Sequence, residues 1–438
     1  MKYCLAVDIG ASGGRHIVGW EGPSGILTEE IYRFPNFMDR EGESLVWNVE
    51  RLFSEVKEGI RLALLKYPNI ESVAIDTWGV DYVLMRGERE VTPVYAYRDK
   101  RTDAVLSEVH SLLSEKELYR RTGLQFKSFD SIFQLYSDKI SGRLDGVTAF
   151  LMLPEYLSYR LTGVWAKERT NATTTGLVNA GTLEFDGEIF DRLGLPRALI
   201  APLVNAGHSL GYLSEETARE VGGNPKVILC ATHDTASAVE ALDIQSDAIY
   251  ISSGTWSILG VKTESALTDE KSRLSGYSNE GGVGYNRYQK NISGMWIIQQ
   301  LRREICPDTP YNDIVDMAKG SAYNEIFDVN DKAFLSPDSM KTAIYDYFRL
   351  HNMPLPTDDA DFFNSAYRSI AYGYKTAIED LEDNVGKSYG SVYIVGGGAK
   401  NGYLNALTES FTKKKIVALP IEATAIGNLK IQLRRREE

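Results

Sequence analysis

A strand–turn–strand unit that occurs twice constrains the fold of this chain more than any other feature. Residues 5–20 contain an apolar strand, a turn of glycine and other small residues, and a second strand. The same order returns at residues 249–260, where Ser253-Gly-Thr-Trp256 is the turn. Elsewhere, apolar runs of strand length alternate with segments of helical periodicity. We therefore predict an α/β protein with two similar domains, residues 1–240 and 241–438.

The spacing of apolar residues predicts the individual elements. Strands are expected at residues 3–9, 15–20, 72–75, 247–252, 257–260 and 391–395. Helices are expected at residues 46–67, 103–121, 130–140, 151–163, 359–384 and 401–411. Residues 169–182, which are rich in Thr, Asn and Ala, are expected to be irregular and to line a cleft.

Composition excludes several classes of function. The chain has 438 residues, 43% of them hydrophobic and 25% charged, as in soluble globular proteins. Its net charge of −12 disfavours non-specific binding to nucleic acid or to an anionic membrane. No run approaches the roughly 20 apolar residues that span a bilayer. We expect small molecules as partners, and a monomer or homodimer.

Cysteine and histidine usage indicates a cytoplasmic protein without a zinc site. Its three cysteines have no paired spacing, and an odd count is poor material for a disulfide framework. The five histidines have no metal-ligand spacing. We therefore expect reduced, buried cysteines.

The first small-residue turn, Asp8-Ile-Gly-Ala-Ser-Gly-Gly-Arg15, is suited to binding an anion. Its glycines let backbone N–H groups approach phosphate oxygens closely. Asp8, at the strand end, could hold Mg²⁺ directly or through water, and Arg15 could contact a phosphate or brace the turn. An ordinary hairpin would have the same composition. The turn lacks the Lys-Ser/Thr of a Walker loop, and its glycine spacing is wrong for a dinucleotide-binding oxidoreductase.

Two segments of the second half are suited to a nucleotide. Ser252-Ser-Gly-Thr255 matches the position of the first turn and offers hydroxyl groups to a phosphate. Val395-Gly-Gly-Gly-Ala-Lys-Asn401 follows a strand and precedes a helix, and its glycines would let a base or ribose lie against the backbone.

Two further segments carry acidic groups at strand ends. Ile75-Asp-Thr-Trp-Gly-Val-Asp81 could hydrogen-bond and stack on a sugar, or form a core turn capped by its two carboxylates. Asp234 follows an apolar run, so it could accept the proton of an attacking hydroxyl. It could equally cap the next helix, because Asp is a preferred cap.

Taken together, these segments resemble the FGGY family of carbohydrate kinases, and within it the rhamnulokinases. The resemblance is ordered and nearly full-length. It includes AVDIGASGGR (6–15), IDTWGVDYVL (75–84), TNATTTGLVN (170–179), ATHDTASAV (231–239), SSGTWSILG (252–260), KNISGMWIIQQ (290–300), IVGGGAKN (394–401) and EATAIGN (422–428). It implies two actin/hexokinase-like, ribonuclease-H-like domains with an interdomain cleft. It also implies that ATP and L-rhamnulose are converted to ADP and L-rhamnulose 1-phosphate in L-rhamnose catabolism.

By position, the resemblance implies a set of site residues. Asp234 matches the proton acceptor, Gly79 and His233 match sugar contacts, and Asp8 is expected near Mg²⁺. The expected nucleotide contacts are Ala11, Ser12, Gly13, Gly14, Arg15, Thr255, Asn291, Gln299 and Gly397.

One departure and two alternatives accompany this interpretation. The family pattern continues for several tens of residues beyond Asn428, whereas this chain ends at Glu438, so we expect a short second domain of lowered stability or activity. One alternative keeps the family but changes the sugar to fuculose, xylulose or another ketose or polyol. The other is a non-catalytic ATP-dependent switch of actin or chaperone type, which would need no sugar pocket.

Overall fold

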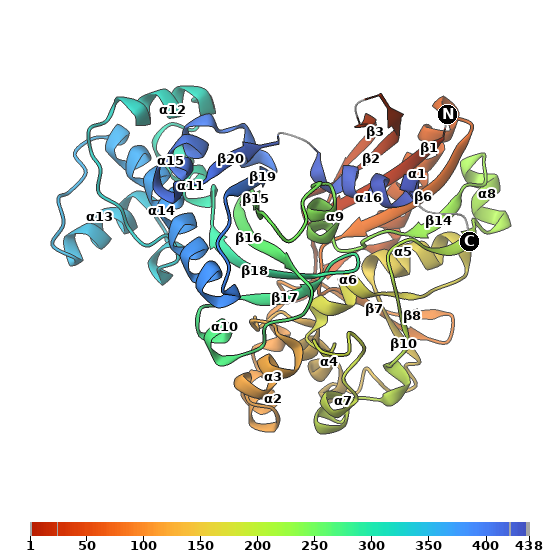
Figure 1. Cartoon of the computed structure of the whole chain (residues 1–438). Coiled ribbons are helices and arrows are strands. Elements are labelled where there is room, and N and C mark those ends of the chain that lie inside the picture. Colours follow the sequence, from red (N-terminus) through yellow and green to blue (C-terminus); the bar gives the residue numbers. More distant parts are fainter. Residues whose placement is uncertain (1, 24, 420–421, 435–438) are drawn as a thin grey trace. The chain divides into compact units, whose positions relative to one another are not determined.

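The computed structural model describes residues 2–23, 25–419 and 422–434. They form two compact units (Figure 1). Unit 1 comprises the described residues of Met1–Asp243, Thr263–Arg287 and Glu422–Glu438, and unit 2 those of Ile244–Lys262 and Tyr288–Ile421. The chain therefore returns to unit 1 twice. Residues 263–287 and the last helix, which the predicted division at residue 240 placed in the second domain, belong by their contacts to unit 1.

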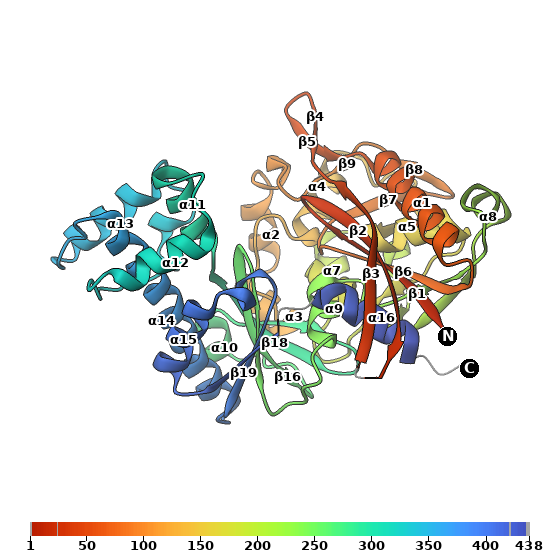
Figure 2. The same ribbon diagram turned by 90° about the horizontal axis from the view of Figure 1, so that it is seen from above.

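Unit 1 is built on a sheet whose described strands number six, in the order β13-β14-β6-β1-β2-β3. Their bounds are β1 (Tyr3–Gly10), β2 (Gly13–Gly22), β3 (Gly25–Pro35), β6 (Ile70–Thr77), β13 (His208–Tyr212) and β14 (Lys226–Leu229). The long strands β2 and β3 lie side by side (Figure 1, Figure 2). Because β6 runs parallel to both β1 and β14, the segments that follow these three strands leave the same edge of the sheet.

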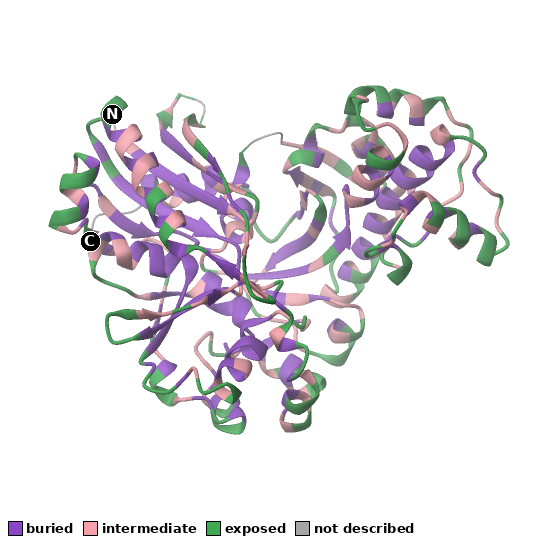
Figure 3. Ribbon diagram, turned by 180° about the vertical axis from the view of Figure 1, so that it is seen from behind, coloured by how far each residue is buried: buried purple, intermediate pink, exposed green. Residues whose placement is uncertain are grey.

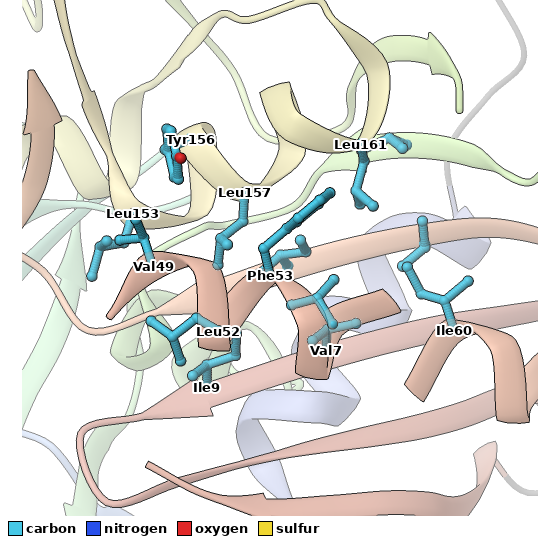
Figure 4. Close-up of a cluster of buried hydrophobic side chains, with 14 of the residues drawn as sticks. Val7, Ile9, Val49, Leu52, Phe53, Ile60, Leu153, Tyr156, Leu157 and Leu161 are labelled. Carbon is cyan, nitrogen blue, oxygen red and sulfur yellow. The ribbon is translucent and has the colours of Figure 1, made fainter. Parts of the chain in front are cut away.

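Helices cover both faces of this sheet, so that β1 is buried along nearly its whole length (Figure 3). Leu5, Val7 and Ile9 point to the face covered by α1 (Val49–Lys66) and α5 (Leu153–Thr162), as Figure 4 shows for Val7 and Ile9. Cys4 and Ala6 point to the opposite face, where they pack with side chains of α16 (Ala423–Arg434). This alternation is the two-residue period of a strand that is buried on both sides.

The other elements of unit 1 form small sheets and short helices. Three further sheets contain β4 (Asp39–Glu41), β5 (Ser44–Trp47) and β9 (Val94–Tyr95); β7 (Tyr82–Arg86), β8 (Arg89–Val91) and β10 (Ala149–Met152); and β11 (Lys167–Glu168) with β12 (Leu203–Val204). The helices are α2 (Leu106–Leu112), α3 (Glu115–Thr122), α4 (Ser131–Ile140), α6 (Arg169–Ala172), α7 (Gly187–Leu193), α8 (Glu215–Val221), α9 (Asp234–Glu240) and α10 (Glu270–Leu274). Strand β17 (Ser278–Gly281) also lies in unit 1.

Unit 2 has a sheet with the order β18-β16-β15-β19-β20. Its strands are β15 (Ile249–Ser253), β16 (Trp256–Thr263), β18 (Asn286–Ser293), β19 (Ser391–Val395) and β20 (Lys415–Ala418). β15 pairs antiparallel with β16 and parallel with β19, which repeats the pattern of β1, β2 and β6 in unit 1. The helices are α11 (Trp296–Ile305), α12 (Tyr311–Gly320), α13 (Met340–Leu350), α14 (Asp359–Val385) and α15 (Gly402–Thr412).

Most predicted elements are present, and two predictions are wrong for local reasons. The single helix predicted at residues 103–121 is two helices, because Ser114 has extended backbone and its hydroxyl caps α3 by accepting from the Glu117 N–H. Residues 169–175, predicted to be irregular, form α6 and a 3₁₀ turn. The buried Glu168 carboxylate starts α6 by accepting the N–H groups of Thr170 and Asn171. Within the described ranges, every helix is too short or too polar to span a bilayer.

A buried histidine in unit 1 makes the stability pH-dependent. His16 on β2 is fully buried, and its Nε2 lies 3.2 Å from the Val56 carbonyl oxygen of α1. Burial lowers the pKa of His16 to about 4. The His16 ring therefore takes up a proton near pH 6.5 in the unfolded chain but only near pH 4 in the folded protein. The stability that the neutral ring contributes is present above pH 6.5 and is lost as pH falls through this window.

We expect the stability difference between the wild type and His16→Gln to shrink by about 3 kcal/mol between pH 7 and pH 4. Urea denaturation at a series of pH values measures this difference, and other titrating groups cancel in the comparison. A difference that does not vary with pH would contradict the buried neutral state of His16.

Candidate active site

The first small-residue turn joins β1 to β2 as a tight hairpin. Gly10 pairs with Gly13, so Ala11 and Ser12 form its tip. A β-carbon on Gly14 would lie 2.2 Å from the Phe34 ring, and one on Gly13 would lie 3.0 Å from the Phe34 carbonyl oxygen. The neighbouring strand β3 thus leaves no room for a side chain at Gly14 and little at Gly13.

An acidic pair lies directly beneath this turn. Asp8 and Asp76 are paired in register on β1 and β6. The Asp8 Oδ2 accepts hydrogen bonds from the Arg15 Nε at 2.9 Å and the Arg15 Nη2 at 2.8 Å. Arg15 also forms an ion pair with Glu422, just before α16. Arg15 therefore braces the turn, which was one of its two predicted roles.

Burial changes the proton affinity of this pair. Burial raises the pKa of the Asp8 carboxyl, although the Arg15 guanidinium opposes the shift. Burial also raises the pKa of Asp76 well above its ordinary value, and the neighbouring Asp8 carboxylate adds to this shift. Asp234 acts electrostatically on both groups in the same direction. The carboxyl groups of Asp8, Asp76 and Asp234 therefore interact electrostatically.

Asp8 has the properties of a protein ligand for Mg²⁺ in a phosphoryl-transfer site. Mg²⁺ in phosphoryl-transfer sites usually binds one or two carboxylates, with waters and phosphate oxygens as its other ligands. Asp8 is a single carboxylate that is 8% exposed, next to the turn suited to phosphate. No group of three or more acidic, histidine or cysteine side chains that could hold a metal ion was found among the described residues.

Asp234 is the first residue of α9, one position inside the residue at the cap. His233 occupies the cap position without a side-chain cap bond. The Asp234 Oδ1 instead accepts hydrogen bonds from the N–H and hydroxyl of Thr235, the next residue. The Asp234 side chain is 31% exposed. The carboxylate therefore bonds a first-turn N–H of α9 and is still partly accessible to a ligand.

The backbone before Asp234 is held tightly by buried groups. The Thr232 carbonyl oxygen accepts from the Thr77 N–H at 3.0 Å and from the Asn171 Nδ2 at 3.2 Å. The Glu168 carboxylate accepts from both the N–H and the hydroxyl of Thr232. These contacts fix His233 and Asp234 beside the segment after β6, which contains Gly79.

Both carboxylates of the segment 76–81 have a structural role. The Asp81 Oδ2 accepts from the Trp47 and Trp78 indoles and from the Tyr97 N–H, at 2.6, 2.8 and 3.1 Å. Burial raises the pKa of Asp81 to about 6. Asp76 and Asp81 are both fully buried, so the idea that they bind sugar hydroxyls is wrong.

Gly79 lies against the threonine-rich segment. A β-carbon on Gly79 would lie 2.7 Å from the Thr174 hydroxyl oxygen, and that oxygen accepts from the Val80 N–H. The segments around Gly79 and Thr174, predicted separately from the sequence, are thus in direct contact.

Unit 2 contains a cavity of about 950 Å³ that suits a nucleotide. Thr255 from the second small-residue turn and Gln299 from α11 line it, and their side-chain oxygens are 3.4 Å apart. Gly397 lines it too, whereas Asn291 is an exposed residue of β18 and is not among its lining residues.

The three consecutive glycines of unit 2 have different roles. Gly396 has φ +83°, and a β-carbon there would lie 2.7 Å from the Ser253 carbonyl oxygen. A β-carbon on Gly398 would lie 2.0 Å from the Ser253 Oγ. Gly397 has open space beside it, so it is the one that a ligand can approach. The first and third glycines instead let this loop pack on the end of β15.

Part of the cavity wall was not predicted. Helix α12 contributes Tyr311, Asn312, Asp316 and Lys319, and α15 contributes Tyr403. No helix was predicted at residues 311–320, although Ile314 and Ala318, four residues apart, are the buried positions of this helix. That spacing was the available signal.

Comparisons with family models and with known proteins cover nearly the whole chain. The model of the FGGY family of carbohydrate kinases, N-terminal domain, matches residues 3–240, and the C-terminal domain model matches residues 249–435. The chain is similar to the rhamnulokinase of Halalkalibacterium halodurans, at 41% identity over 99% of this chain and 93% of the relative. It is 39% identical to the rhamnulokinase of Oceanobacillus iheyensis, with the same coverage. For that of Bacillus subtilis the identity is 36%, over 98% and 89% of the two chains.

Solved structures show the fold. A ligand-bound xylulose kinase from Lactobacillus acidophilus matches with a TM-score of 0.82 at 15% identity, over 99% of this chain and 89% of the other. A gluconate kinase from the same organism matches with a TM-score of 0.81 at 16% identity, with the same coverage. The predicted two-domain, actin/hexokinase-like fold is confirmed.

Proposed function

This chain belongs to the FGGY family of carbohydrate kinases, and we propose that it phosphorylates L-rhamnulose to L-rhamnulose 1-phosphate with ATP. The similarity to rhamnulokinases along nearly the whole chain supports this choice of sugar. L-Rhamnose catabolism in the cytoplasm, where ATP is available, is the setting that we propose. The partners would be the sugar and the nucleotide, with the protein as a monomer or homodimer.

One observation carries the chemical part of the proposal. Asp234 is an accessible carboxylate at the start of α9, in the same electrostatic environment as Asp8 and its phosphate-type turn. A base beside a phosphate site is the arrangement that hydroxyl phosphorylation needs.

In the proposed reaction, a sugar hydroxyl oxygen attacks the γ-phosphorus of ATP. The new oxygen–phosphorus bond forms as the bond to the oxygen bridging the β- and γ-phosphorus breaks, and ADP leaves. Asp234 accepts the hydroxyl proton, while Gly79 and His233 bind the sugar. Mg²⁺, bound near Asp8, would neutralise charge on the phosphates.

The remaining residues would position the nucleotide. Backbone N–H groups of the first turn and the Thr255 hydroxyl would donate to phosphate oxygens, and Gly397 would lie against the nucleoside. The expected contacts of the first turn are Ala11, Ser12, Gly13, Gly14 and Arg15. The nucleotide would also contact Gln299, which lines the cavity of unit 2, and Asn291 of β18.

A panel of sugars tests the proposal. We expect ADP release with ATP and Mg²⁺ to depend on L-rhamnulose. The kcat/KM values for L-fuculose and D-xylulose should be lower than that for L-rhamnulose by a factor of about 10² or more. Wrong hydroxyl stereochemistry leaves buried polar groups unpaired, which discriminates strongly. A preference for another sugar would replace the substrate but keep the kinase. ATP hydrolysis that no sugar accelerates would favour the switch instead.

A further inference from the structure

We propose that an ion pair between the buried Arg287 and the partly exposed Glu280 positions His233 by fixing which of its ring nitrogens carries the proton. The Arg287 Nη2 lies 3.0 Å from the His233 Nδ1 and 2.9 Å from the Glu280 Oε2. The inference rests on the proposed function, because it concerns the histidine that would bind the sugar.

The ion pair is anchored independently of the histidine. Arg287 is fully buried, and its Nε donates to the Gly281 carbonyl oxygen at 3.0 Å. The Gly281 N–H donates to the Thr173 hydroxyl at 2.8 Å, in the threonine-rich segment that contacts Gly79. Within unit 1, β17 and the turn after it are therefore held against the threonine-rich segment, on the side of the proposed sugar site.

The charges support each other. Burial alone would raise the pKa of the Glu280 carboxyl, but the Arg287 guanidinium and other nearby donors lower it further, so the pKa lies below its ordinary value. Glu280 thus stays ionised at neutral pH and balances the buried cation of Arg287. A buried ion that is paired and hydrogen-bonded in this way holds a defined geometry.

The donor chemistry decides the tautomer. The His233 Nδ1 lies 3.0 Å from the Arg287 Nη2 and 3.3 Å from the Glu280 Oε2. A guanidinium has only N–H donors, so the shorter of these contacts requires Nδ1 to be the acceptor. The proton of the neutral ring then lies on Nε2, since the bond made by one nitrogen sets the tautomer of the other. Nε2 lies 3.4 Å from the Asp234 Oδ1. His233 therefore presents an N–H donor beside the proposed base, suited to a hydroxyl oxygen of the sugar.

Two variants separate the donor from the charge. Glu280→Gln keeps the Arg287 N–H on Nδ1, and we expect it to keep the tautomer. Adding Arg287→Met removes this donor without leaving an unpaired charge, and Nδ1 can then take the proton and donate to the amide oxygen of residue 280. Nε2 becomes an acceptor, and the proposed donor to the sugar is lost. Thermal unfolding checks that both variants fold.

The direct readout is the ¹⁵N spectrum of the imidazole nitrogens at neutral pH, without sugar or nucleotide. The chain has five histidines, and the signals missing in His233→Gln identify those of His233. We expect an unprotonated Nδ1 in the wild type and in Glu280→Gln, and a protonated Nδ1 in the double variant. A protonated Nδ1 in the wild type would overturn the inference.

Kinetics supply the second readout. The double variant should raise KM for L-rhamnulose about tenfold, as for one lost hydrogen bond, with KM for ATP unchanged. On a His233→Ala background the same two changes should have no further effect on this KM. An equal rise there would show that the pair acts otherwise than through His233. If the wild type does not use L-rhamnulose, the proposed function fails, but the spectrum still decides the tautomer.

Discussion

Replacing Asp234 with Asn should lower kcat for sugar phosphorylation by about 10²–10⁴-fold, or about 3–5 kcal/mol of barrier. Asn has nearly the same shape and can keep the contact with Thr235, but it cannot accept the proton of the attacking hydroxyl. KM values should change little, because binding does not need the proton to move. ADP release with ATP, Mg²⁺ and L-rhamnulose measures the effect.

Asp191→Asn is a matched control, because Asp191 is an exposed carboxylate of α7 paired with Arg197. It should have the wild-type rate. Equal thermal stability of Asp234→Asn and the wild type would exclude unfolding as the cause of a lower rate. If Asp234→Asn retains its sugar-dependent rate, Asp234 is not the proton acceptor, although the kinase would remain.

The sequence predicted local elements well because each depends on a local pattern. The strand 3–9 and the helix 359–384 agree with β1 and α14 to within one residue at each end. The long helix begins after Asp358, whose carboxylate accepts from the Asp361 N–H, and ends at Gly386 in the left-handed region. Such start and stop signals are contained in a few neighbouring residues.

Contacts between distant segments could not be predicted in the same way. The three glycines 396–398 look equivalent in the sequence, but packing against Ser253 requires two of them and leaves Gly397 beside open space. Asp81 looked like a ligand group, and only the folded structure brings Trp47 to its carboxylate. The partners in both cases are more than 30 residues away, so no local pattern shows them.

The candidate site shows the same limit. Asp234 was singled out from its place after an apolar run, and its role as the base stays a prediction, while only the structure shows its contact with Thr235. Glu280 and Arg287 were missed, because they contact His233 across about fifty residues of sequence. The expected cleft between the domains stays a prediction.

The return of the last helix to unit 1 was also not predicted, and it leads to the second large effect. Gly427 of α16 lies against α9: a β-carbon there would be 1.7 Å from the Ser237 carbonyl oxygen and 3.1 Å from the Ala241 nitrogen. These are backbone atoms, so a small side-chain movement cannot relieve the clash. Gly427→Ala must therefore separate α16 from α9, the helix that begins with Asp234.

We expect Gly427→Ala to lower the free energy of unfolding by about 3 kcal/mol or more, at or above the upper end of overpacking effects. Urea denaturation measures this value. Gly320→Ala is a control of the same chemistry, since Gly320 ends α12 with nothing near its β-carbon position. That change should be neutral or stabilising by up to about 1 kcal/mol.

The same substitution should also reduce activity, because α16 supports the acidic pair. The Asn428 Nδ2 donates to the Asp76 Oδ2 at 2.5 Å and to the Ala74 carbonyl oxygen at 3.2 Å. Moving α16 would break these buried bonds and disturb the carboxyl groups around Asp8. If Gly427→Ala is as stable as the wild type, α16 and α9 pack less closely than the structure shows. Lost stability with full activity in the remaining folded protein would separate α16 from the site.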